Sequence, residues 1–253
     1  MTFKPAYLTI DDSPSSTMLE KADYLSRQGI PAIWFCQGNL LEQEPRQAVH
    51  AIQAGFILGN HAYDHPHFSD LALDECFEQI RRTDEILEAV YRKAGAKRPI
   101  KCFRFPYGDK GGLQGAEVFA PYSEAGLQRK QTLQTYLRRL GYAQPRWERI
   151  TYRYFRDAGL MDDADCYWTY DVMEWSILDA EPSHGIDTIE KALARMDEHD
   201  PEGGRGLNDA GSAEIVLIHD HAKTASYFTP LVERLLEKGL RFTLPAFEAV
   251  NAG

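Results

Sequence analysis

Five short clusters of acidic, basic and imidazole side chains stand out in this sequence of 253 residues. They are Asp11 with Asp12, His61 with His65, Arg104, Asp171 with Glu174, and His219 with Asp220. One carboxylate and two imidazoles, with coordination positions left open, suit zinc or a similar divalent ion in a hydrolytic site. Such an ion lowers the pKa of bound water to about 7 and polarises the attacked carbonyl. A base and an acid among the remaining side chains would complete metal-assisted hydrolysis.

The two histidines of the second cluster are four residues apart. On a helical turn, this spacing places His61 and His65 on one face, where both imidazoles can bind one cation. Pro66 disfavours helical geometry at His65, so we expect a single turn near its end. Asp64 and His67 are rival ligands close by.

The two aspartates have a competing interpretation. Asp11 and Asp12 precede Ser13 and Pro14, and aspartates in such a position more often form turns or cap helices. At the end of a strand, successive side chains diverge, so one carboxylate can bind a metal while its neighbour faces the attacking water. The sequence alone leaves both interpretations open.

The other clusters are also ambiguous when each is taken alone. His219 follows the apolar run 215–218, where a histidine is usually a hydrogen-bonded structural group. Arg104 could be the ion-pair partner of a neighbouring acid, and Tyr107 and Trp175 could be aromatic residues of the core or rim. Four further histidines have no supporting context and are left out of the predicted site: His50, His184, His199 and His221.

Alternating strands and helices position these clusters. Short apolar runs rich in β-branched and aromatic residues predict seven strands, at 6–10, 32–36, 56–58, 101–104, 166–170, 214–218 and 241–244. Helical spacing follows the first strand, where Thr17 and Glu20 predict a capping box and Gly29 a stop. Further helices are predicted at 73–94 and 228–238.

This alternation predicts an α/β fold with a mostly parallel sheet, open or closed into a barrel. The polar clusters directly follow five different strands, and the carboxyl ends of parallel strands open onto one face. Residues distant in sequence are therefore expected to converge there. We expect a single domain over 1–253, with a long insertion at about 109–165 between the fourth and fifth strands and a glycine-rich loop at 202–212.

The composition of the chain bears on which binding partners and which cellular compartment to expect. A formal net charge of −10 gives no electrostatic argument for binding nucleic acid or an anionic membrane. The sequence has no run of about 18 apolar residues and no visible signal peptide, so neither a membrane span nor export is expected. Four scattered cysteines are expected to be buried reduced thiols, which favours the cytoplasm. The sequence makes no prediction of oligomeric state.

The clusters lie in segments that resemble five motifs of one family. Residues 9–12 (TIDD) look like the first motif of the polysaccharide deacetylases, the NodB-type or family 4 carbohydrate esterases. Residues 59–66 (GNHAYDHP), 103–108 (FRFPYG), 171–175 (DVMEW) and 217–220 (LIHD) are similar to the other four, in the family's order. The match spans most of the chain.

The resemblance implies a distorted (β/α) barrel of seven strands, which agrees with the strand prediction. It implies Asp12, His61 and His65 as ligands of Zn²⁺, or of another divalent metal such as Co²⁺ or Ni²⁺. In this assignment Asp11 is the general base and His219 the general acid.

The remaining roles are also implied by the resemblance. The backbone N–H of Tyr107 would be an oxyanion donor, Arg104 would orient Asp11, and Glu174 would tune His219. The side chains of Tyr107, Trp175 and Leu217 would contact the substrate.

Three features depart from the family's pattern. Ile10 stands where phenylalanine is usual, and Glu174 stands where aspartate is usual, which leaves Asp171 as another candidate to tune His219. The distance in sequence from Arg104 to the fourth motif is much longer than usual because of the insertion. The substrate therefore cannot be carried over from family members that act on chitin or peptidoglycan.

The leading hypothesis is hydrolysis of the N-acetyl group of an amino sugar or an acetylated oligosaccharide or polysaccharide. An alternative keeps the mechanism and changes the substrate to an O-acetyl ester on xylan, or to a small amide such as a ureide or formamido sugar. Two other hypotheses are a non-haem iron oxygenase, whose ligands are also two histidines and a carboxylate, and a non-catalytic sugar-binding module.

Overall fold

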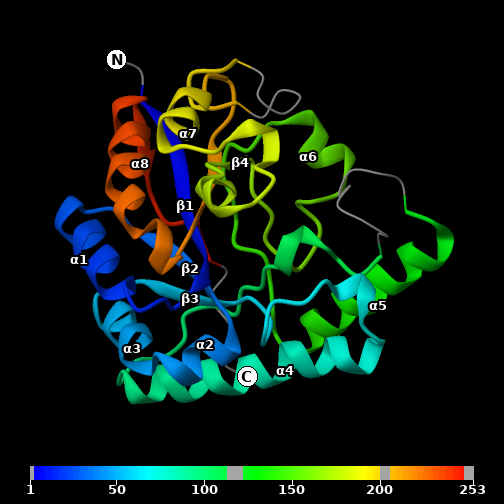
Figure 1. Cartoon of the computed structure of the whole chain (residues 1–253). Coiled ribbons are helices and arrows are strands. Elements are labelled where there is room, and N and C mark those ends of the chain that lie inside the picture. The colour runs from blue at the N-terminus through cyan, green and yellow to red at the C-terminus, as the bar shows by residue number, and fades with distance from the viewer. Residues whose placement is uncertain (1–2, 113–121, 200–205, 248–253) are drawn as a thin grey trace.

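A parallel sheet of six strands forms the centre of the computed structural model, which describes residues 3–112, 122–199 and 206–247 (Figure 1). The strands are β1 (Lys4–Ser13), β2 (Ala32–Cys36), β3 (Ile57–Asn60), β4 (Tyr170–Asp171), β5 (Glu214–His219) and β6 (Leu240–Phe242). Their order is β3-β2-β1-β5-β4, and β6 pairs with the beginning of β1. Every pairing is parallel, so the carboxyl ends of the strands lie on one side of the sheet.

Alternate residues of the strands belong to two hydrophobic clusters on opposite faces of the sheet. Leu8 of β1 and Trp34 of β2 pack in the larger cluster, which also contains apolar residues of the surrounding helices. Tyr7 and Ile33, their neighbours in sequence, belong to the cluster on the other face. Because both faces are covered, the strands appear in the sequence as continuous apolar runs.

The prediction of a seventh strand at 101–104 is wrong for the described residues. Phe103 instead forms isolated parallel bridges with Asn60 at the end of β3 and with Asp165, while Lys101 bridges Tyr142 of the insertion. The backbone groups of this segment are thus divided among three partners and form no continuous ladder. The parallel α/β class is confirmed, and the predicted barrel is distorted at this point, where bridges replace a strand between β3 and the segment that leads to β4.

Helices surround the sheet, and Figure 1 shows α1, α3 and α8 along one side and α4 beneath α2. Their bounds are α1 (Met18–Gln28), α2 (Gly38–Gln43), α3 (Pro45–Gln53), α4 (Leu73–Lys93), α7 (Ile189–Arg195) and α8 (Ala225–Glu237). Short 3-10 helices lie at Phe68–Asp70, Pro106–Gly108, Glu174–Leu178, Ser183–Gly185 and Ala222–Thr224. Gly29 ends α1 with a φ of 66°, as predicted. The prediction of a capping box at Thr17 is wrong. The Thr17 side chain makes no capping bond, and its hydroxyl lies 2.9 Å from the Ser15 hydroxyl instead.

The insertion packs against the sheet and α4. It contains α5 (Glu124–Arg139) and α6 (Arg153–Asp157), and residues 113–121 lie outside the described part of the chain. Leu133 of α5 is fully buried in a third cluster with Ile80 of α4 and Phe103. The insertion is therefore continuous with the apolar interior beside the segment 101–104.

The four cysteines are free and buried, as expected from their apolar surroundings. Among the described helices, none is long and apolar enough to cross a membrane. Of the predicted glycine-rich loop 202–212, residues 202–205 lie outside the described residues.

Candidate active site

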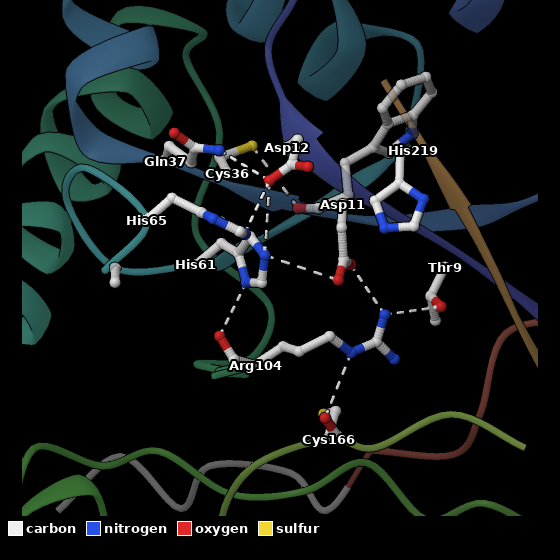
Figure 2. Close-up of polar contacts among 12 residues, drawn as sticks. Thr9, Asp11, Asp12, Cys36, Gln37, His61, His65, Arg104, Cys166 and His219 are labelled. Carbon is white, nitrogen blue, oxygen red and sulfur yellow. Dashed lines mark hydrogen bonds and ion pairs between the residues drawn. The ribbon is translucent and has the colours of Figure 1, made fainter. Parts of the chain in front are cut away.

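Four of the five polar clusters lie at the carboxyl ends of strands, as the parallel sheet requires, and Arg104, which follows no strand, joins them by its hydrogen bond to Asp11. Asp11 of β1 and His219 of β5 are register partners in the ladder between these strands. The ladder between β1 and β2 changes register after Ile10, and Asp12 there has a φ of 59°. A bulge of this kind redirects side chains. As a result the carboxylates of Asp11 and Asp12 do not diverge as expected, and each has an oxygen 3.6 Å from Nε2 of His61 (Figure 2).

Asp12, His61 and His65 form a set of potential metal ligands whose donor atoms all lie within 4.8 Å of one another. Oδ1 of Asp12 is 3.2 Å from Nε2 of His65. Nδ1 of His61 is 2.8 Å from the carbonyl oxygen of Arg104, to which it can donate, leaving Nε2 with a lone pair for a cation. Burial lowers the pKa of His65 to about 4, so the imidazole of His65 is neutral at neutral pH. One carboxylate and two imidazoles fit a divalent transition-metal ion.

The two histidines lie on a loop, and the predicted helical turn is wrong. Ala62 and His65 have φ values of 63° and 62°, in the left-handed region. The loop is fixed by long-range contacts instead of helical bonds: Gln79 of α4, for example, accepts from the backbone N–H of Tyr63 at 2.8 Å. Asp64, a rival ligand, accepts from the amide of Gln79 at 2.7 Å and is not in the ligand set.

Two residues outside the predicted site hold Asp12. Nε2 of Gln37 donates to its Oδ1 at 2.7 Å, and Nε2 of His221 lies 2.8 Å from its Oδ2. Burial raises the pKa of Asp12, but the hydrogen bond to His221, together with the neighbouring imidazoles of His65 and His61, outweighs this and holds the pKa well below its usual range. Leaving His221 out of the predicted site was therefore wrong. The sequence did contain a signal for His221: it follows His219 by two residues and so lies just beyond the carboxyl end of the same strand.

Arg104 orients Asp11 from beneath the site. Its side chain is fully buried, and Nη1 donates to Oδ1 of Asp11 at 2.8 Å and to the hydroxyl of Thr9 at 2.9 Å. Nε donates to the carbonyl of Cys166 at 3.2 Å, and the guanidinium lies over the ring of Phe35. These contacts fix the guanidinium, so the carboxylate of Asp11 is held in one orientation beside the ligand set (Figure 2).

His219 pairs with Glu174 on the other side of the site. Nδ1 of His219 is 3.2 Å from Oε1 of Glu174, a side chain that is 1% exposed. Burial lowers the pKa of His219, but the charge and hydrogen bond of Glu174 outweigh it and raise the pKa to about 10. The extra methylene of glutamate therefore does not prevent this pairing.

Asp171 holds the tryptophan next to this pair. Its Oδ2 accepts from Nε1 of Trp175 at 3.0 Å and its Oδ1 from the backbone N–H of Met173 at 2.7 Å. Burial raises the pKa of Asp171 to about 6. The ring centroids of Trp175 and His219 are 6.3 Å apart. Asp171 adds to the negative charge near His219, but its hydrogen bonds go to Trp175 and the backbone.

The predicted substrate contacts differ in accessibility. Tyr107 is 53% exposed, has a φ of 57°, stacks on His67 at 3.8 Å and lies edge-on to His65 at 4.4 Å. Trp175 is partly buried. Leu217 is only 2% exposed and pairs with Asp171 in the ladder, so its contact with a substrate stays a prediction.

Comparison with known proteins gives a consistent result. The family model of the polysaccharide deacetylases matches residues 1–129. The peptidoglycan-N-acetylmuramic acid deacetylase PdaC of Bacillus subtilis is 31% identical over 247 residues, which cover 96% of this chain and 38% of that protein. A peptidoglycan-N-acetylglucosamine deacetylase of Bacillus cereus is 35% identical over 103 residues, which cover 40% of this chain and 36% of that protein. The chain thus matches well under half the length of either relative.

The fold is also that of a solved structure. The family 4 carbohydrate esterase from Streptomyces lividans, in complex with acetate, superposes with a TM-score of 0.56 at 20% identity. The superposition covers 95% of this chain and 92% of that one. At this identity the similarity establishes the architecture, so the chemistry has to be argued from the site.

Proposed function

This chain belongs to the polysaccharide deacetylase family, and we propose that it is a metal-dependent hydrolase that removes the acetyl group from an N-acetylated amino sugar in an oligosaccharide or polysaccharide. The observation that carries the proposal is the placement of two reactive side chains around one ligand set. Asp11 and His219 are register partners on β1 and β5, and the donor atoms of Asp12, His61 and His65 are gathered beside them.

Asp11 suits the role of general base. Its carboxylate is held by Arg104, so its two oxygens have fixed directions, and one of them lies 3.6 Å from the ligand His61. A water molecule attacking a carbonyl next to the ligand set can therefore transfer its proton to Asp11. When bound by Asp12, His61 and His65, a divalent ion would supply the Lewis acidity that activates this water and polarises the carbonyl.

His219 suits the role of general acid. An amine is a poor leaving group until it is protonated, and a histidine whose pKa is about 10 carries its proton throughout the neutral range. Glu174 holds Nδ1, which leaves Nε2 to donate the proton to the leaving nitrogen. The backbone N–H of Tyr107 is our candidate for the oxyanion donor, a kind of group worth about 3–4 kcal/mol of the barrier.

The sugar substrate is supported by the relatives and by the accessible aromatic residue at the site. The two bacterial relatives are named as deacetylases of N-acetylglucosamine and N-acetylmuramic acid in peptidoglycan. The ring of Tyr107, half exposed and fixed by stacking on His67, offers an apolar surface on which a sugar ring can pack.

Acetate release is the decisive test. The chain loaded with Zn²⁺ would be incubated with N-acetylated chitooligosaccharides, with acetylated xylan and with small amides, and acetate would be measured with and without a chelator. Chelator-sensitive release from the chitooligosaccharides, also in the absence of oxygen, is the expected result. Faster acetate release from acetylated xylan would instead identify an O-acetyl ester as the substrate, and hydrolysis of a small amide would identify that class of substrate. No turnover by a metal-loaded chain would favour a sugar-binding module.

A further inference from the structure

We propose that the insertion supports the metal-binding loop through Tyr142, whose hydroxyl fixes the side-chain amide of Asn60 in the orientation that the loop requires. The inference rests on the metal site proposed above and gives the insertion a function in it. Tyr142 is a positioning residue in this proposal, because it contacts neither a ligand atom nor a substrate.

Tyr142 is one of the residues through which the insertion contacts the rest of the fold. It follows α5, is 2% exposed, and forms a parallel bridge with Lys101, reinforced by a bond of 3.0 Å from the N–H of Ala143 to the carbonyl of Lys101. Its ring lies edge-on to Phe103 and under the guanidinium of Arg98. The ring is therefore held on several sides, and its hydroxyl has a fixed place in the interior.

The direction of the hydrogen bonds at this hydroxyl follows from Asp84 of α4. Arg98 and Lys101 both donate to the carboxylate of Asp84, at 2.6 and 2.7 Å, and the hydroxyl of Tyr142 lies 2.6 Å from its Oδ1. Burial raises the pKa of Asp84, but the charge of Arg98 and the hydrogen bonds outweigh this and lower it, so the carboxylate is ionised and can only accept. The single proton of the Tyr142 hydroxyl therefore points to Asp84.

The oxygen of Tyr142 is consequently left as an acceptor for the amide of Asn60. Nδ2 of Asn60 donates to this oxygen at 2.7 Å and to the carbonyl of Ile80 at 2.9 Å. Both amide hydrogens are then used, so Oδ1 faces the other way and accepts from the backbone N–H of Ala62 at 2.9 Å. Asn60 is fully buried, and no exposed orientation competes with this one.

The bond to Ala62 acts on the backbone that carries the metal ligand His61. Ala62 has a φ of 63°, a conformation that a residue with a side chain adopts only where the surroundings hold it. His61 lies between Asn60 and Ala62 in sequence, so the two ends of this short segment are linked by the Asn60 side chain. Asp84, Tyr142, Asn60 and Ala62 thus form one hydrogen-bond chain from α4, through the insertion, to the loop.

The test removes only the hydroxyl. Tyr142→Phe keeps the ring and breaks the chain at both Asp84 and Asn60, and we expect the full chain to bind Zn²⁺ and Co²⁺ about tenfold more weakly in competition with a chromophoric chelator. The visible absorption bands of the Co²⁺-loaded chain should also shift, because the ligand geometry changes. Tyr136→Phe is the matched control: it makes the same change on α5, where the ring stacks on Phe77, and should alter neither measurement.

Leu133→Ala serves as a second control, because it loosens the packing of the insertion and leaves the hydrogen-bond chain in place. Equal affinity and an equal Co²⁺ spectrum in Tyr142→Phe and the unchanged chain would overturn this inference and leave the metal site standing. A loss of affinity in Leu133→Ala as large as that in Tyr142→Phe would overturn it too, since general loosening would then suffice. If the unchanged chain bound neither ion, the proposed function and this inference would both fall.

Should Tyr142→Phe fail to fold, Asn60→Ser breaks the same link from the other side. Serine cannot reach both Tyr142 and Ala62, so the same tenfold loss and the same spectral change are expected. An unchanged affinity in folded Asn60→Ser would count against the inference in the same way.

Discussion

Replacing Glu174 by glutamine tests how the site keeps its acid protonated. The substitution preserves the size of the side chain and removes the charge that faces His219. Glu174 is 1% exposed, and its Oε1 lies 3.2 Å from Nδ1 of His219. In the unchanged chain this carboxylate outweighs the effect of burial and raises the pKa of His219 from 6.5 to about 10.

The size of the effect follows from this distance. Two unit charges 3.2 Å apart, in a medium with an effective dielectric constant of about 20, interact with about 5 kcal/mol. At about 1.4 kcal/mol for each pH unit, this corresponds to almost 4 units. Glu174 also raises the pKa of Asp171, so Asp171 becomes more fully ionised without it and replaces part of the lost charge; we therefore expect the pKa of His219 to fall by about 3 units in Glu174→Gln.

The sign of the activity change follows from the role of His219. A general acid works in its protonated form, so activity is present below the pKa of His219 and is lost as the pH rises through it. Glu174→Gln should therefore move the alkaline limb of kcat/KM for acetate release about 3 units toward lower pH. A bound dication lowers the pKa of His219 in the unchanged chain and in Glu174→Gln alike, so the difference in pKa between the two proteins is preserved.

Two measurements check this. The first is the pH profile of acetate release, and the second is an NMR titration of the Cε1 proton of His219 in the metal-free chain, which needs no substrate. Glu174→Asp is the control, because it keeps the charge at a greater distance and should lower the pKa less than Glu174→Gln does. A Glu174→Gln variant whose His219 titrated as in the unchanged chain would refute the reasoning.

Three further predictions test other parts of the site. Asp11→Asn should retain its metal and lose acetate release by about 10²- to 10⁴-fold, because the base goes while the ligand Asp12 stays; a rate near that of the unchanged chain would show that another group is the base. His221→Ala should weaken Zn²⁺ binding about tenfold in chelator competition, since Asp12 loses a hydrogen-bond partner, whereas His50→Ala should bind as before, because His50 lies in α3 and pairs with Asp23. Arg104→Met should lower the free energy of unfolding in urea by about 3–5 kcal/mol, because it leaves a buried carboxylate without its cation, and a loss below about 1 kcal/mol would contradict that account.

The strands β1, β2, β3, β5 and β6 were predictable from the sequence, whereas β4 shares only Tyr170 with the strand predicted at 166–170. The bounds of β2 agree with the prediction because its apolar residues 32–36 are bounded on both sides and buried on both faces. The segment 101–104 has only Cys102 and Phe103 between two charged residues, and its pairing depends on Tyr142 and Asp165, which lie about 40 and 60 residues further along. Local sequence predicts that a segment can be extended. Whether its backbone groups pair with one neighbouring strand or with several separate residues depends on the fold.

The loop that carries the proposed ligands His61 and His65 shows a second limit of prediction from sequence. The spacing of His61 and His65 correctly indicated that their side chains meet, because both belong to one ligand set with Asp12. The helical turn inferred from the same spacing was wrong, because long-range bonds hold Ala62 and His65 at positive φ. A local pattern therefore predicted which side chains are neighbours and failed to predict the backbone that brings them together.

His221 was missed for the opposite reason. No local pattern distinguishes it from other surface histidines, and its partner Asp12 is 209 residues away in sequence. What could have identified it is the pairing of β1 with β5, which places the residues after His219 next to those at the end of β1. Applying the predicted sheet to each residue that follows a strand end, and not only to those within motifs, would have brought His221 into the site.

These outcomes separate the groups that we propose to react from those that orient them. The side chains proposed to react follow strand ends, so one rule about parallel sheets brings them together. Their partners lie elsewhere: Arg104 reaches Asp11 from beneath, and Tyr142 reaches the loop from the insertion through Asn60. A chain with the same five motifs and a shortened insertion would keep every ligand and lose the contact that fixes Asn60. Its metal affinity should then fall although no motif has changed.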